Sequence, residues 1–159
     1  MLTPQLVMYE DEVRQIQSIA DRLQADSRSR AILVVDKNGQ LIAASGSAAE
    51  LDTTSLSSLV AGNVAATGGI AKLIEEEEFT GQFHEGKGIS VHMTIVSRKM
   101  ILVVLFDRNT THGLVRLRVK KAMGELEHVL EEVAKKAQTP QANVFAEITD
   151  ADIDNLFND

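Results

Sequence analysis

The spacing of apolar positions predicts three helices within the first 137 residues. From Gln5 to about Ala25, apolar residues recur at alternating steps of three and four, which marks one stripe of an amphipathic helix. Thr3 and Pro4 precede it as a predicted cap and first-turn proline. A second helical spacing runs from a cap within 52–54 to about Ile74, and a third covers about 110–137.

Between the helices the pattern predicts strands. AILVVDKNGQLIAASG at 31–46 predicts a hairpin around Asn38-Gly39, because these residues tolerate the positive φ of tight turns. FTGQFHEGKG at 79–88 predicts a short strand, and ISVHMTIVSRKMILVVLFD at 89–107 predicts a second hairpin that turns at Arg98-Lys99. The order helix-strand-strand-helix-strand-strand-strand-helix predicts an α+β fold: a three-layer α/β/α sandwich around a five-stranded antiparallel sheet.

The second helix carries unusually little charge. A helical wheel of SLSSLVAGNVAATGGIAKL (55–73) and Ile74 predicts a buried side made of Leu56, Leu59, Val60, Asn63, Thr67, Ile70, Ala71 and Ile74. The opposite side, here named the small-residue face, consists of Ser58, Ala61, Gly62, Ala65, Gly68, Gly69 and Lys72. An outer surface that lacks charge is typical of an interface core, so we expect this face to pack on a second copy or a partner. The alternative is that the helix ends near Thr67 and that Gly68-Gly69 is its stop signal.

Composition narrows the possible functions. The 159 residues carry a net charge of −7, which gives no electrostatic support for a nucleic-acid partner. The absence of cysteine excludes disulfides and thiolate chemistry. The longest apolar run, 101–106, is far too short to insert across a membrane, and the amino end lacks the pattern of a signal peptide. We therefore expect a soluble cytoplasmic protein.

No catalytic, metal or cofactor site is predicted. The four histidines, at 84, 92, 112 and 128, fall on different predicted elements without the spacing of metal ligands. The glycines do not follow a strand in a phosphate-binding pattern. We expect no catalytic residues, no metal and no cofactor.

The chain changes character after residue 137. We assign 1–137 to one domain and 138–159 to an acidic linker with a short amphipathic helix, because no Lys or Arg follows Lys136. The tail residues expected to dock on a partner are Ile148, Ile153, Leu156 and Phe157. A short helix of this kind folds when it enters a groove on a partner. The alternative is a tail folded back on its own domain.

In the order of its elements and in three segments, the chain resembles the Roadblock/dynein-light-chain family over about residues 5–137. The segments are AILVVDKNGQLIAASG, SLVAGNVAATGGIAKL and ISVHMTIVSRKMILVVLFD. The resemblance implies a homodimer paired through the second helix and the third strand, at about 79–84, with Phe79, Gly81 and Phe83 at the paired edge. It is strongest to bacterial members that bind a Ras-like small GTPase, raise its hydrolysis rate through the small-residue face, and act in gliding motility and polarity at a cell pole.

The route to faster hydrolysis has two alternatives. An arginine finger would come from Arg22, Arg28, Arg30, Arg98, Arg108, Arg116 or Arg118, none of which lies on the second helix. The favoured route is conformational: the dimer binds only the catalytically arranged switch regions of the GTPase. The tail is expected to dock on the GTPase away from the nucleotide and to modulate nucleotide exchange.

Three further alternatives remain open from the sequence. The chain could be a passive Roadblock scaffold that binds a GTPase without changing its turnover. It could be a PAS-like ligand-sensing module, although an aromatic content of 4% disfavours a ligand pocket. The acidic run 75–78 is interpreted as a solvated helix end, the alternative being steering toward a basic partner surface.

Overall fold

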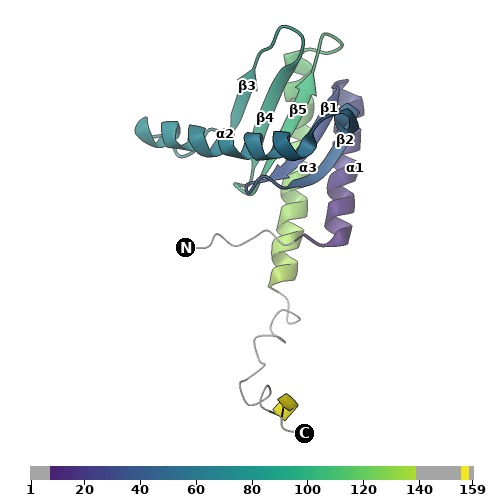
Figure 1. The fold of residues 1–159 in the computed structure, drawn as a ribbon. Coiled ribbons are helices and arrows are strands. Elements are labelled where there is room, and N and C mark those ends of the chain that lie inside the picture. Colours follow the sequence, from purple (N-terminus) through teal and green to yellow (C-terminus); the bar gives the residue numbers. More distant parts are fainter. Residues whose placement is uncertain (1–7, 139–154, 158–159) are drawn as a thin grey trace.

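A computed structural model of the chain describes residues 8–138 and 155–157. The predicted order of elements is confirmed (Figure 1). The elements are α1 (Glu10–Ser27), β1 (Ala31–Asp36), β2 (Leu41–Gly46), the 3₁₀ turn η1 (Ser47–Glu50), α2 (Thr53–Leu73), β3 (Gly81–His84), β4 (Ser90–Val96), β5 (Met100–Phe106) and α3 (His112–Ala137).

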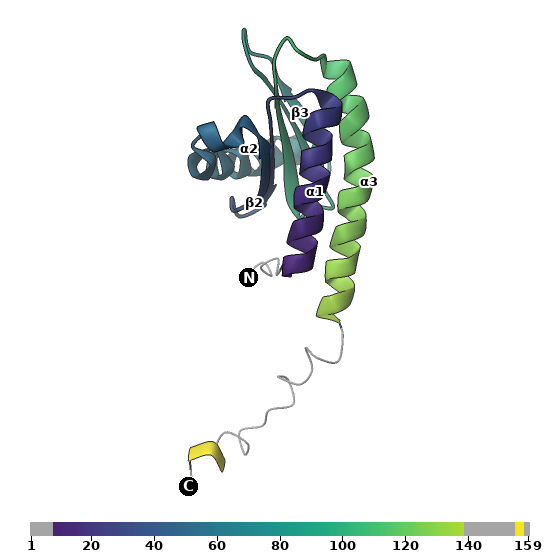
Figure 2. The same cartoon turned by 90° about the vertical axis from the view of Figure 1, so that its right-hand side faces the viewer.

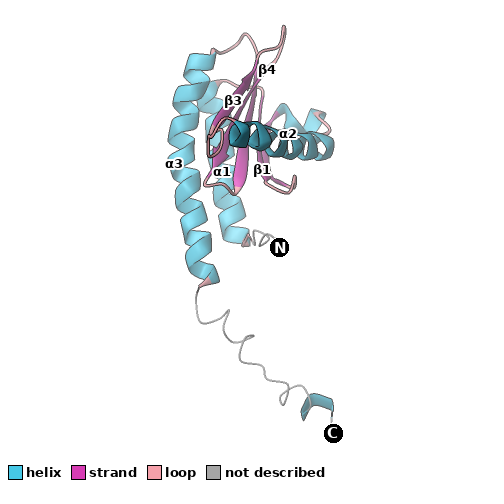
Figure 3. Ribbon diagram, turned by 90° about the vertical axis from the view of Figure 1, so that its left-hand side faces the viewer, coloured by secondary structure: helices cyan, strands magenta, loops and turns pink. Residues whose placement is uncertain are grey.

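The sheet has five antiparallel strands in the order β2-β1-β5-β4-β3. β5 and the first five residues of β1 are uninterrupted apolar runs because both strands lie in the centre with helices on both faces, and every residue of both strands is buried. α1 and α3 pack side by side on one face, and α2 crosses the other (Figures 2 and 3). The predicted three-layer α/β/α sandwich is therefore confirmed.

Alternation along the strands divides the core into two halves. Side chains such as Val34, Leu102 and Val104 point toward α1 and α3 and meet Ile16 and Leu126. The intervening positions point toward α2; they include Leu33, Met93 and Val103, which pack with Val60 and Val64. The α2 layer thus rests on a smaller core than the α1/α3 layer.

Both hairpin turns use left-handed backbone conformations. Gly39 has φ +88°, and a Cβ there would lie 3.1 Å from Ser58 Cα, so the first turn needs glycine both for its backbone and for its approach to α2. In the second hairpin the positive φ values belong to Ser97 and Arg98, and Lys99 N donates to Val96 O at 3.0 Å. This turn is centred one residue earlier than predicted.

α1 begins later than predicted. Tyr9 is extended and the helix starts at Glu10, so the start expected at Gln5 is wrong; the expected cap, Thr3-Pro4, lies outside the described residues. The sequence pattern also missed Glu12, whose buried carboxylate forms an ion pair with Lys136 at the far end of α3. This pairing lowers the pKa of Glu12 and raises that of Lys136.

α3 ends at Ala137, and the division of the chain after residue 137 stays a prediction. Of the four tail residues predicted to dock, Ile148 and Ile153 lie outside the described ranges. Leu156 and Phe157 belong to a helical turn at 155–157 and are 79% and 81% exposed. Among the residues that the structure describes, no helix has the length and apolar character needed to span a membrane.

Candidate interaction surface on the second helix

α2 is one continuous helix with a strong amino-terminal cap. Asp52 accepts from Ser55 N at 3.1 Å and from Ser55 Oγ at 2.6 Å, and these bonds lower the pKa of the Asp52 carboxyl. The helix continues through Gly68 and Gly69 to Leu73, so the alternative in which the glycine pair ends it is wrong.

The side of α2 that is buried differs from the one predicted. Ser57, Val60, Val64 and Ala71 are the buried positions, whereas Leu59, Ile70 and Ile74, predicted to be buried, are 71%, 52% and 62% exposed. The buried stripe is rotated relative to the wheel, which leaves Leu59 outside. At the other end, α2 extends beyond the edge strand β3, so no sheet lies beneath its last turns (Figure 1).

The small-residue face is accessible along its whole length. Ser58, Gly62, Ala65, Gly69 and Lys72 are exposed, and the remaining two members, Ala61 and Gly68, are half-buried. A Cβ added to Gly62, Gly68 or Gly69 would meet no atom within 4 Å. Packing within this chain therefore does not require glycine at these positions, although each glycine costs about 1 kcal/mol of helix stability.

A second exposed strip, here named the apolar ridge, runs beside the small-residue face. It consists of Leu59, Ala66, Ile70 and Leu73, at the steps of seven, four and three that keep residues on one side of a helix. Leu73 is 86% exposed. Sequence reasoning missed this ridge because it assigned Leu59 and Ile70 to the core. Together the two strips make the outer side of α2 almost entirely apolar or small.

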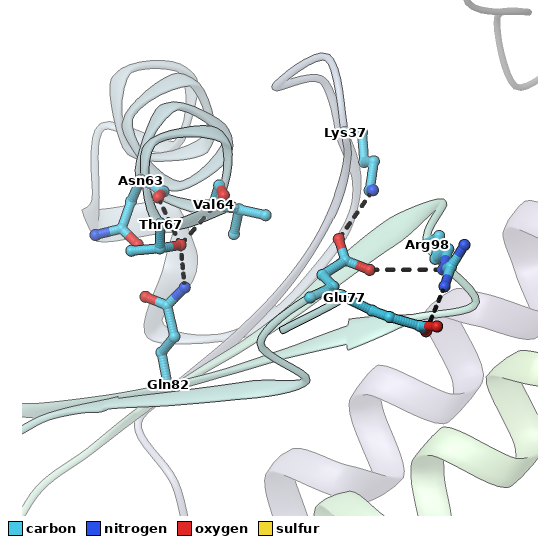
Figure 4. A network of polar contacts seen from close by, with 8 residues as sticks. Lys37, Asn63, Val64, Thr67, Glu77, Gln82 and Arg98 are labelled. Carbon is cyan, nitrogen blue, oxygen red and sulfur yellow. Dashed lines mark hydrogen bonds and ion pairs between the residues drawn. The ribbon is translucent and has the colours of Figure 1, made fainter. Parts of the chain in front are cut away.

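β3 forms the edge of the sheet next to the overhanging part of α2. Phe83 points to the α1/α3 side, where its ring stacks on His112 with 3.9 Å between centroids, and Phe79 precedes the strand and is half-buried. Gln82 Nε2 donates to Thr67 Oγ1 at 2.7 Å and ties the strand to α2 (Figure 4). The edge strand and the helix are thus held as one unit.

The acidic run 75–78 is partly neutralised inside the molecule. Glu77 pairs with Arg98 at 3.2 Å and Glu78 with Lys37 at 3.1 Å, and Arg98 also approaches Glu78 (Figure 4). Neither sequence interpretation, solvated end or steering, included these pairs. Arg98 and Lys72 border a shallow hollow of about 480 Å³ beside α2.

The structure brings together two histidines that the sequence placed on separate elements. His92 Nδ1 lies 3.1 Å from His112 Nε2, and Thr94 Oγ1 lies 2.9 Å from His92 Nε2. Burial, with His112 and Arg116 nearby, lowers the pKa of His92 to about 4. Within the described ranges, no three His, Cys, Asp or Glu side chains are grouped so that they could hold a metal ion.

Comparison with known proteins agrees with this architecture. The model of the Roadblock/LC7 domain matches residues 15–106. Myxococcus xanthus MglB is 55% identical with a TM-score of 0.76, and the match covers 80% of this chain and 96% of that one. The gliding protein MglB of Thermus thermophilus is 28% identical with a TM-score of 0.75, over 82% of this chain and 99% of that one.

A third solved structure, described as MglB with a tetrameric arrangement, is 27% identical with a TM-score of 0.76, over 83% of this chain and 99% of that one. No match was found among curated proteins. The family model covers more than half of the chain, and the Myxococcus relative is similar over nearly its whole length. On this evidence the chain belongs to the Roadblock/LC7 domain family.

Proposed function

We propose that this chain is a homodimeric activator of a Ras-like small GTPase of the MglA type, acting in cell polarity and gliding motility. Because the chain belongs to the Roadblock/LC7 family, it is a regulator of a GTPase without a catalytic centre of its own. The same family membership argues against the PAS-like alternative. The observation that carries the proposal is the accessible outer side of α2, where two apolar or small strips adjoin.

The apolar ridge is the part suited to a second copy. Leu59, Ile70 and Leu73 are large and exposed, and the last turns of α2 extend beyond the free edge of β3 (Figure 1). A twofold pair that joins α2 to α2 and β3 to β3 buries these side chains and removes the unpaired strand edge in one step. Burying each such side chain contributes about 1.5–3 kcal/mol.

The small-residue face is the part suited to the GTPase. Its side chains leave the helix backbone open to close contact, and its members Ser58, Gly62, Ala65 and Gly69 carry no charge to desolvate. A rigid, flat surface of this kind binds one conformation of the switch regions better than others. Binding then shifts the conformational equilibrium of the GTPase toward its hydrolytic state. The size of the shift is set by the ratio of the activator's affinities for the two conformations.

Arg98 is the arginine finger candidate that borders the hollow beside α2. Its guanidinium is held by Glu77 and Glu78, so reaching a nucleotide would break two ion pairs. Two other candidates, Arg22 and Arg30, pair with Glu125 and Asp107. These pairs count against Arg22, Arg30 and Arg98 as fingers, and Arg98→Ala is expected to leave substantial stimulation.

The tail adds a second contact with the GTPase in this proposal. Leu156 and Phe157 are exposed apolar side chains in a helical turn, as expected of anchors for a partner groove. Docking there, away from the nucleotide, would modulate nucleotide exchange. The protein is expected to act in the cytoplasm and to concentrate at a cell pole.

GTP turnover by the cognate GTPase, with and without this protein, tests the proposal. Ala65→Arg places a long charged side chain on the exposed small-residue face, so we expect stimulation to be lost while dimer mass and circular dichroism stay unchanged. Ile70→Glu charges the ridge and is expected to give monomers. Ala25→Arg, at an exposed alanine of α1, is the matched control and should change neither property.

Two results would contradict this function. If the native chain leaves GTP turnover unchanged while binding the GTPase, the protein is a passive scaffold. If Ala65→Arg stimulates as well as the native chain does, the small-residue face is not the contact surface.

A further inference from the structure

The amino-terminal half of α3 is a basic region on an acidic protein. Between Arg108 and Gly124 the sequence has five Lys or Arg and no Asp or Glu, although the whole chain carries −7. Four of the five, Arg116, Arg118, Lys120 and Lys121, lie on α3. Within residues 8–138 and 155–157 no carboxylate forms an ion pair with any of these four. Arg118 Nε is buried and has no hydrogen-bond partner there.

An open groove of about 550 Å³ runs between α1 and α3, on the layer opposite α2 (Figure 2), and of these four cations Lys121 lines it. Its lining includes Ile19, Arg22, Lys121, Gly124, His128 and Val129. Arg22 pairs with Glu125, so those two charges offset each other. Gly124 leaves part of the wall without a side chain, and exposed Leu117 lies about one helical turn before Lys121. The groove therefore combines apolar contact area with the positive charge of Lys121, for which no ion pair is found within the described residues.

The chain itself carries a segment of complementary chemistry. Residues 138–159 contain five carboxylates, at 147, 150, 152, 154 and 159, and no Lys or Arg. In the helical turn 155–157, Leu156 and Phe157 have no apolar contact that hides them. Charge and apolar surface in the tail thus match those of the groove.

The tail is also long enough to reach the groove. Lys121 lies 17 residues before Gln138, which is about 26 Å along a helix. The nine residues 139–147 span up to about 30 Å when extended. A helix over 149–157 would be about 14 Å long, close to the length of α3 from Lys121 to Val129. These lengths allow the tail to turn back and lie along the groove.

We propose that the acidic tail docks in the groove between α1 and α3 of its own chain, with its carboxylates facing the basic half of α3 and Leu156 and Phe157 packing beside Gly124. This contact is a property of the protein alone, so its test needs no GTPase and can succeed or fail independently of the function proposed above. If the GTPase also binds the tail, the groove and the GTPase compete for the same segment.

Disulfide trapping in the full-length protein tests the contact, because the native sequence has no cysteine. Gly124→Cys combined with Asn155→Cys should form an intramolecular disulfide under mild oxidation, read by non-reducing mass. We expect trapping at least tenfold faster than in Lys99→Cys with Asn155→Cys, where the first cysteine lies in the β4–β5 turn.

Charge reversal supplies the second arm. Lys120→Glu with Lys121→Glu in the trapping background should slow disulfide formation about tenfold at low salt. Lys87→Glu with Lys99→Glu, an equal charge change at exposed lysines elsewhere, should not slow it. Equal trapping at the groove and the turn, insensitivity to Lys120 and Lys121, or disulfides formed only between chains would each overturn docking on the tail's own chain.

Discussion

At the scale of single residues, the glycines of α2 support the contact proposed for its outer face. Gly69 sits in the last turns of a 21-residue helix, is exposed, and would meet nothing within 4 Å if it carried a Cβ. Alanine there should stabilise the folded chain, because glycine in a helix costs about 0.5–1 kcal/mol relative to alanine. The native residue thus gives up stability that the isolated chain could have.

Gly69→Ala is therefore expected to separate stability from function. We predict a gain of about 0.5–1 kcal/mol in the free energy of unfolding together with a several-fold loss of GTPase stimulation, because the added methyl group separates two closely packed backbones. Gly113→Ala in the first turn of α3, where the nearest atom to an added Cβ would be Thr111 Oγ1 at 3.9 Å, is the matched control. It should gain stability and keep full stimulation. If the control loses stimulation and Gly69→Ala keeps it, the assignment of the contact to the outer side of α2 is contradicted.

At the scale of elements, the sequence predicted well wherever the pattern had one interpretation. β1 and β5 follow from the apolar runs 31–35 and 100–106, which a central strand satisfies, and the cap of α2 is Asp52, within the predicted range 52–54. The buried side of α2 was not predictable in the same way. Leu59 and Ile70 are as apolar as core residues, and only the placement of α2 across and beyond the sheet shows that they are exposed.

A pairing between elements that the sequence could not show is the contact of β4 with the start of α3. His92 and His112 are 20 residues apart in sequence and meet only because α3 packs across the end of β4. The folded chain holds the pKa of His92 near 4, against 6.5 ordinarily, and also lowers that of His112. Between those values the unfolded chain binds a proton that the folded chain does not.

Stability should therefore fall as the pH drops from about 6.5 toward 5. His92→Gln removes the principal group responsible and is expected to flatten this dependence, measured as urea midpoints at several pH values. A slope unchanged by His92→Gln would show that another group causes it.

At the scale of the whole molecule, the two faces of the sandwich have different chemistry. The α2 face carries exposed apolar and small side chains, which the proposed function assigns to a second copy and a GTPase, whereas the α1/α3 face has a groove lined by Lys121. The acidic tail leaves from the end of α3 and has two candidate destinations, the groove of its own chain and the GTPase. A single segment cannot occupy both, so the two proposals together require competition.

If the groove and the GTPase compete for the tail, one kind of variant should bind the GTPase more weakly than the native chain and another more tightly. Deleting residues 139–159 should weaken binding to the GTP-loaded GTPase, because one contact is lost. Lys120→Glu with Lys121→Glu should strengthen it several-fold, measured by calorimetry, because the tail no longer has to leave the groove before it binds. In the truncated chain the same charge reversal should have no effect, since the groove has no tail to hold. If it weakens binding there as well, the basic half of α3 contacts the GTPase directly and does not act through the tail.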